Sequence, residues 1–327
     1  VHKWQIDLMK EVSEFCRNRE IYCHKAQFIP QIAVLNSTYN RYHTSKFLFQ
    51  CEGEDQALQG ITQLLCETGQ TFEILSEHNL TGCMDKYPLI VVPEIKIIDD
   101  QFKSELLEYA KKGGSLLLIG TDTYNLLRQD LELYGELETG DYLLSDDGSG
   151  WAYNHGAFIK NSFAGLSHGL MALQTDIDDG AKYAAAEIVR HGDGMIGFIL
   201  ADIGDTYLRR KSHVHRQFMK SMLGRLYEPK IVMDGPMYVD MTVMEKDSAL
   251  MINLVNTAGP HANKDVYTID DIPPVGPVYI KMKCDKEPEV VKLVPSDTLI
   301  RTAWDKRKKL LSVKIPQINI HEILVIR

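Results

Sequence analysis

Four short apolar runs, separated by amphipathic segments, most constrain how this chain can fold. They lie at residues 32–35, 72–75, 89–92 and 115–119. Between them, residues 55–69 and 99–112 carry apolar side chains at three- and four-residue spacing, which indicates helices. Strands that are apolar throughout and alternate with helices are typical of a parallel sheet covered on both faces. We therefore predict an α/β fold of the flavodoxin-like, three-layer kind.

The pattern becomes less regular after residue 120. Residues 135–150 are rich in glycine and aspartate and predict an irregular stretch. Residues 185–190 and 195–201 flank a His-Gly-Asp-Gly turn signal, so the sheet is expected to finish with an antiparallel hairpin. One helix over residues 207–227 is expected to close this domain.

Helical periodicity disappears from residue 229 onward. Short apolar runs follow at roughly ten-residue spacing, separated by proline, glycine, aspartate or lysine turns. This pattern predicts an all-β sandwich of seven or eight strands, in which Lys306–Lys309 forms a solvated hairpin tip. We divide the chain into a first segment at residues 1–29, an α/β domain at 30–228 and a sandwich at 229–327.

The first segment is predicted to be one amphipathic helix over residues 2–20. Trp4, Leu8, Val12 and Phe15 form a single apolar stripe along it. No second helix follows closely enough to form a helical hairpin, so the stripe must pack on something distant in the sequence. A part of the protein outside this chain is one such partner, and a start at Val1 rather than Met is typical of a processed or cut end.

Composition and motifs exclude several classes of function. Lys and Arg number 36 against 45 Asp and Glu, a net charge of −9, and no basic stripe offers contacts to nucleic acid. No apolar run reaches the ~18 residues that a membrane span needs. The six cysteines form no C-x-x-C pair, so free thiols are expected and no metal site. Neither G-x-G-x-x-G nor a P-loop motif is present, and no cofactor is expected.

Polar residues that follow the predicted strands are the candidate ligand or interface sites, because ligands of such sheets lie beyond the carboxyl ends of the strands. Loop residues beside glycines and the start of the last helix extend this rim. The candidates are Asn36, Tyr39, Arg41, His43, Glu94, Thr121, Asp122, Trp151, His155, Asp202 and Tyr207. Helix capping explains several of them equally well, since Thr121 is a favoured N-cap residue.

No catalytic residue is assigned. The position after the fourth strand holds Thr121-Asp122, and neither G-x-S-x-G nor G-x-C-x-G occurs in the chain. His213 and His215 are two residues apart on the last helix, so they point to different sides and cannot bind one metal. We expect both on a solvent-facing surface.

Three stretches carry a resemblance to a known family. Residues 15–20 through 35–37 are similar to the segment that joins the last barrel helix of a TIM-barrel glycoside hydrolase to a β-galactosidase trimerisation domain. Residues 109–120, Tyr-Ala-Lys-Lys-Gly-Gly-Ser-Leu-Leu-Leu-Ile-Gly, resemble a helix and strand of that domain, which belongs to the class I glutamine amidotransferase-like superfamily. Residues 254–256 and 320–326 resemble the terminal sandwich of β-galactosidase-like and fucosidase-like hydrolases.

The resemblance implies a non-catalytic, carboxy-terminal region of such a hydrolase. Residues 1–29 would then be the remnant of a preceding barrel domain, which would hold the catalytic carboxylates. The amidotransferase-like domain would be degenerate, with Thr121 near the place of the lost catalytic cysteine. It would serve homo-oligomerisation and shape the cleft that binds carbohydrate in the parent enzyme. A self-sufficient amidotransferase-like enzyme and a stand-alone sugar-binding module are the alternatives, and the sequence leaves the compartment open.

Overall fold

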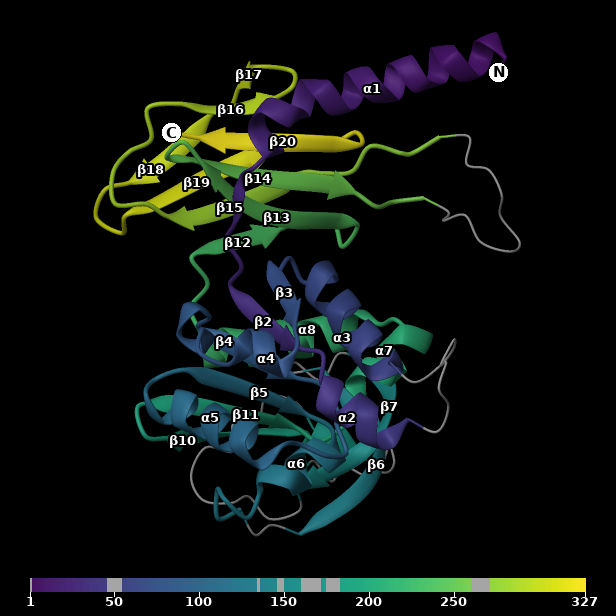
Figure 1. The fold of residues 1–327 in the computed structure, drawn as a ribbon, viewed down its shortest axis with the longest axis vertical. Coiled ribbons are helices and arrows are strands. Elements are labelled where there is room, and N and C mark those ends of the chain that lie inside the picture. Colours follow the sequence, from purple (N-terminus) through teal and green to yellow (C-terminus); the bar gives the residue numbers. More distant parts are fainter. Residues whose placement is uncertain are drawn as a thin grey trace. The chain divides into compact units, whose positions relative to one another are not determined.

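The computed structural model describes residues 2–45, 55–133, 136–145, 150–159, 172–174, 183–259 and 271–327. The chain divides into two compact units, each of which is drawn in Figure 1. The α/β unit comprises Gln31–Thr68 and Phe72–Pro229. The sandwich unit comprises Val1–Pro30, Gly69–Thr71 and Lys230–Arg327. An α/β domain followed by a β-sandwich is therefore confirmed, and the first helix groups with the sandwich unit.

The centre of the α/β unit is a six-stranded sheet in the order β10-β11-β5-β4-β2-β3. Its strands are β2 (Ile32–Leu35), β3 (Phe72–Leu75), β4 (Leu89–Val92), β5 (Ser115–Ile119), β10 (Ala186–His191) and β11 (Gly194–Ile199). Every neighbouring pair is parallel except β10 and β11, which form the expected antiparallel hairpin. Parallel strands bring their carboxyl ends to one edge, which is where the candidate rim was predicted.

Helices cover both faces of this sheet. One apolar core joins it to α3 (Gln56–Glu67), α7 (Ile203–Arg209) and α8 (His213–Leu226). The other core joins it to α4 (Glu77–Leu80), α5 (Asp100–Lys111) and α6 (Thr121–Leu127). Two short helices, α2 (Thr38–Thr44) and the 3₁₀ turn η1 (Met84–Lys86), follow β2 and α4. Alternate residues of β2 point into opposite cores, Ile32 into the first and Ala33 into the second, as a three-layer sandwich requires.

Two expectations about this unit are wrong. The single helix over 207–227 is two helices, because α7 ends at Arg209 and the hydroxyl of Ser212 then caps α8 by accepting a hydrogen bond from the amide of Val214 at 3.2 Å. The stretch expected to be irregular holds all of β6 (Leu137–Leu144), which pairs with β7 (Trp151–Ile159) in an antiparallel ribbon with an irregular register between Gly140 and Tyr142. The strands β8 (Ala172–Gln174) and β9 (Tyr183–Ala184) close this ribbon in the order β6-β7-β9-β8.

Two antiparallel sheets form the sandwich unit, in the orders β1-β13-β14-β20-β16-β17 and β12-β15-β19-β18. The first holds β1 (Gln27–Phe28), β13 (Val239–Lys246), β14 (Ala249–Asn256), β16 (Val291–Val294), β17 (Thr298–Leu299) and β20 (His321–Ile326). The second holds β12 (Ile231–Asp234), β15 (Val278–Lys283), β18 (Thr302–Asp305) and β19 (Leu310–Ile315). One apolar core lies between them. Lys306–Lys309 connect β18 to β19, which confirms the expected hairpin tip.

The helix α1 (Lys3–Cys23) is attached to the sandwich unit by its carboxyl end. Tyr22 and Cys23 pack against the outer face of β14 and β20, and the guanidinium of Arg19 donates to the carbonyl of His321 at 3.1 Å. No residue of α1 is buried. Trp4 is 64% exposed and Leu8 52%, so the described part of the chain leaves the predicted apolar stripe uncovered.

Candidate functional site

The carboxyl edge of the parallel sheet brings several of the candidate residues together. Glu94 follows β4, Thr121 and Asp122 follow β5, and Asp202 follows β11. A Cβ placed on Gly120, where φ is +94°, would lie 2.5 Å from the carboxyl carbon of Glu94. Only glycine fits there, because its backbone turns in a left-handed conformation directly against the glutamate side chain.

The carboxylates of this edge influence one another. Burial raises the pKa of Glu94, and the nearby charges of Asp122 and Asp202 raise it further, although its Oε1 accepts a hydrogen bond from the amide of Asp122 at 3.4 Å. Burial also raises the pKa of Asp202, and the charge of Asp205 acts in the same direction. The hydroxyl of Thr206 donates to Asp202 at 3.0 Å and opposes this shift. Half-buried carboxylates of this kind hold their protons more tightly than exposed ones do.

Thr121 occupies the position where a nucleophile would be expected, but its hydroxyl is already engaged. It donates a hydrogen bond to the backbone carbonyl of Leu200 at 2.9 Å. An activated hydroxyl instead needs a base as its hydrogen-bond acceptor. Thr121 therefore acts as a structural link between the ends of β5 and β11.

His155 belongs to the same region but comes from β7. Its Nδ1 lies 2.8 Å from a carboxylate oxygen of Asp141 on β6, and this hydrogen bond raises the pKa of the imidazole. The carbonyl of His155 accepts a hydrogen bond from the amide of Asp202 at 3.3 Å. The β6–β7 ribbon is thereby joined to the end of β11, a connection that the sequence did not reveal.

Trp151 lies on the same outward face of β7 as His155, because the two are four residues apart on a strand. It is 53% exposed, and its ring meets that of Tyr142 edge to face at 5.4 Å between centroids. Tyr153 lies between them on the strand and is 37% exposed. Tyr142 and Tyr153 are functional candidates that the sequence did not reveal, and Tyr142 lies within residues 135–150, which were expected to be irregular.

Other candidates lie in two separate places. Asn36 and Arg41 line a small cavity with Glu94, and the guanidinium of Arg41 pairs with the carboxylate of Asp55. Tyr39 and His43 stack on each other at 4.1 Å within α2 and line a different groove of about 540 Å³. Asn36 and Arg41 therefore join the edge around Glu94, whereas Tyr39 and His43 line a separate groove.

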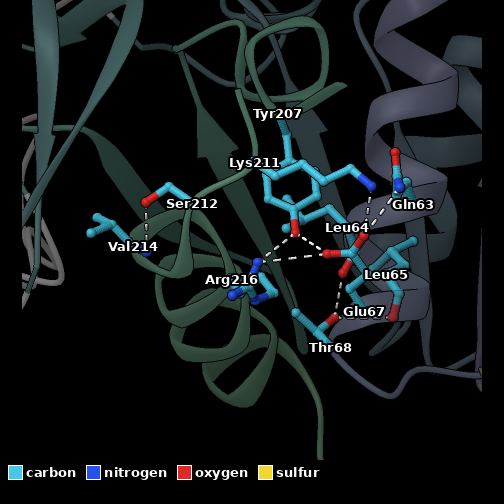
Figure 2. Close-up of polar contacts among 10 residues, drawn as sticks. All are labelled: Gln63, Leu64, Leu65, Glu67, Thr68, Tyr207, Lys211, Ser212, Val214 and Arg216. Atoms are coloured by element: carbon cyan, nitrogen blue, oxygen red, sulfur yellow. Dashed lines mark hydrogen bonds and ion pairs between the residues drawn. The ribbon is translucent and has the colours of Figure 1, made fainter. Parts of the chain in front are cut away.

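Tyr207 lies inside the helical layer, not at the rim. Figure 2 shows its hydroxyl beside the carboxylate of Glu67, with Arg216 and Lys211 around the same carboxylate. The Glu67 side chain is only 9% exposed and lies 3.2 Å from the ammonium of Lys211 and 3.6 Å from the guanidinium of Arg216. Burial and the neighbouring Glu67 raise the pKa of Tyr207. These groups tie α3, α7 and α8 together and satisfy one another.

His215 is fully buried, so the expectation that both histidines of the last helix face solvent is wrong for this one. Its ring packs edge to face on Tyr207 at 5.8 Å between centroids. Burial lowers its pKa to about 4, and the positive charge of Arg216 contributes to the lowering. His213, on the next face of α8, is exposed as expected.

The described residues contain no group of three or more His, Cys, Asp or Glu side chains that could hold a metal ion. They also contain no helix that is long and apolar enough to cross a membrane.

Comparison with known proteins gives matches to solved structures alone. No protein-family model and no curated protein sequence matches the chain. The α-L-fucosidase isoenzyme 2 of Paenibacillus thiaminolyticus matches with a TM-score of 0.74 at 16% identity, over 100% of this chain and 53% of the fucosidase. A β-galactosidase from Bacillus circulans sp. alkalophilus matches with a TM-score of 0.61 at 12% identity, over 97% of this chain and 44% of its own.

A third match is a catalytic mutant of Gan42B, a GH42 β-galactosidase from G. stearothermophilus. Its TM-score is 0.57 at 15% identity, over 92% of this chain and 40% of the galactosidase. At such identities these likenesses establish the fold alone. The chain spans about half of the fucosidase and less than half of the two galactosidases.

Proposed function

We propose that this chain is the non-catalytic, carboxy-terminal region of a glycoside hydrolase of the β-galactosidase-like or fucosidase-like kind. It serves assembly into a homo-oligomer and shapes the cleft in which the parent enzyme binds carbohydrate. Structures that share its fold over nearly all of its length are named as glycosidases, and each is about twice as long or longer. The α/β unit corresponds in this proposal to the trimerisation-like domain of the amidotransferase-like superfamily.

The uncovered face of α1 carries this proposal. A helix of 21 residues with none buried exposes more apolar side chain than a folded domain ordinarily leaves in water. Of the stripe, Val12 is 55% exposed, in addition to Trp4 and Leu8. At about 25 cal/mol per Å² of apolar surface, covering such a face contributes several kcal/mol. A barrel domain preceding Val1 is the partner that the proposal assigns to it.

The surroundings of Thr121 favour this role over a self-sufficient amidotransferase-like enzyme. Its hydroxyl donates to a backbone carbonyl, not to a histidine, and its strand end is held by that bond. Thr121→Ala should therefore leave any measured activity of the protein unchanged. A loss of activity in this variant would favour the enzyme alternative.

The first experiment concerns catalysis and gene structure. The chain alone should not hydrolyse nitrophenyl glycosides, whereas the longer product of its reading frame, containing a (β/α)₈ barrel, should do so. Turnover by the chain alone, or an upstream frame that encodes no barrel, would overturn the proposal.

The second experiment tests the face of α1 in that longer protein. Leu8→Asp places a charge in the apolar stripe and should lower the free energy of unfolding by about 2 kcal/mol or more, because an unpaired charge is buried. Arg17→Ala, an exposed position of the same helix that lies two residues from Phe15 and so on the opposite side from the stripe, is the control and should change it by less than about 0.5 kcal/mol. Equal effects of the two substitutions would contradict burial of the stripe.

A further inference from the structure

The outward face of the β6–β7 ribbon presents an aromatic surface beside a polar hollow. Trp151 and Tyr153 alternate with the buried residues Ala152 and Asn154, so both rings stand on the solvent side of β7. The ring of Tyr142 lies against both, at 5.4 Å from Trp151 and 6.3 Å from Tyr153, each edge to face. Tyr142 thereby supports both rings from the neighbouring strand, and we call these three residues the aromatic platform.

The platform continues directly into the hollow, because Tyr153 belongs to both. The hollow encloses about 280 Å³ and is otherwise lined by His155, Asp202, Asp205, Thr206, Arg209 and Arg210. Its volume equals that of roughly nine liquid water molecules. One monosaccharide unit fits such a space.

The polar groups of the hollow offer both donors and acceptors. Asp202 and Asp205 accept hydrogen bonds, while the two guanidinium groups donate them. Arg209 pairs with Asp205 at 2.7 Å, and the guanidinium of Arg210 lies 4.4 Å from the centre of the Tyr153 ring. The two carboxylates and two guanidinium groups cancel in formal charge. Such a hollow favours an uncharged ligand rich in hydroxyl groups over phosphate or a carboxylate anion.

We propose that this surface binds a neutral pyranose unit, with one apolar face of the sugar on Trp151 and Tyr153 and its hydroxyl groups toward Asp202, Asp205 and Arg209. A pyranose combines these properties, since its C–H groups gather on one face and its hydroxyl groups project at the rim. An aromatic ring supplies the matching flat apolar contact. The location follows from these residues alone, whereas the choice of a sugar among neutral polyols rests on the proposed function.

Binding is tested on the chain as it exists, with galactose, L-fucose and their methyl glycosides as probes. The indole N–H signal of Trp151, assigned by its loss in Trp151→Phe, is followed by NMR during each titration. A saturating shift with at least one neutral sugar is expected. Trp151→Ala and Tyr153→Ala should each weaken the affinity, measured by calorimetry, by roughly fivefold to tenfold. Both side chains are exposed, so the fold is expected to survive, and far-UV circular dichroism checks it.

Tyr42→Ala is the matched control. Tyr42 is a tyrosine of the same unit, is 89% exposed and lies outside the platform and the hollow, so its loss should leave the affinity unchanged. No shift of the Trp151 signal with any neutral sugar, or equal weakening by Tyr42→Ala, would overturn the inference. Stronger binding of galacturonate or inorganic phosphate than of galactose would overturn the ligand class. Sugar binding by a chain whose reading frame encodes no barrel would overturn the proposed function alone.

Discussion

Replacing His215 should remove a large part of the acid sensitivity of the α/β unit. The imidazole, on α8, is fully buried and lies against the ring of Tyr207. Burial lowers its pKa from 6.5 to about 4. The folded chain therefore keeps His215 neutral at a pH where the unfolded chain protonates it. Because the unfolded state then binds more protons, stability falls as the pH falls from about 6.5 toward 4.

The size of this effect follows from the two pKa values. For one group with a pKa of about 4 in the folded state and 6.5 in the unfolded state, the stability lost between pH 7 and pH 5 is about 2 kcal/mol. Glu94 and Asp202 act in the opposite direction, because their raised pKa values make the folded chain bind protons more readily. Their contribution is present in every variant and cancels when variants are compared.

The assay is urea unfolding at pH 7 and pH 5, followed by the fluorescence of Trp151 in a Trp4→Phe, Trp304→Phe background. His215→Leu should lose about 2 kcal/mol less than the parent between the two pH values. His213→Gln, which removes an exposed histidine two residues away on α8, should behave like the parent. The reasoning is refuted if His215→Leu and the parent lose equal stability, or if an NMR titration of the folded chain gives His215 a pKa near 6.5.

Two further substitutions test the interior of the same unit. Glu67→Gln leaves the partly exposed guanidinium of Arg216 without its carboxylate and should cost about 2 kcal/mol in urea unfolding, whereas Glu108→Gln breaks an exposed ion pair and should cost less than about 0.5 kcal/mol. Gly120→Ala should cost about 2 kcal/mol or more in thermal unfolding, because its Cβ meets Glu94 and φ is positive. Gly224→Ala, on the exposed side of α8 with open space around it, should instead stabilise by about 0.5–1 kcal/mol. A stable Gly120→Ala variant or a tolerated Glu67→Gln would contradict these assignments.

The sequence predicted the strands and helices whose own residues carry a regular apolar pattern. The strands at Ile32–Leu35 and Ser115–Ile119 are buried on both faces. Their sequences are therefore apolar throughout, which made them recognisable. The stripe of α1 was equally readable, since a helix marks its apolar face by spacing alone. These signals need no knowledge of what the element packs against.

The elements that escaped prediction depend on contacts between distant residues. Residues 137–144 form strand β6, which is only partly buried and has an irregular register between Gly140 and Tyr142. Its pairing with β7 is what makes it a strand. The break between α7 and α8 lies at Ser212, which caps α8. It was not predicted because apolar residues recur at helical spacing on both sides of it. His215 reads as a polar residue in sequence, and only the packing of α8 on the sheet shows that it is enclosed.

The candidate site shows the same contrast between what a local pattern predicts and what contacts between distant residues decide. Sequence reasoning selects polar residues at strand ends, yet Thr121 and Tyr207 proved to be satisfied by the chain's own carbonyl and carboxylate groups. The hydroxyl groups of Thr121 and Tyr207 hold elements of the fold together, so a ligand could engage them only by breaking those bonds. We therefore place the proposed recognition at surfaces that folding leaves exposed, the stripe of α1 and the platform around Trp151. Both surfaces are apolar and exposed, as is typical of surfaces that contact a partner or a ligand.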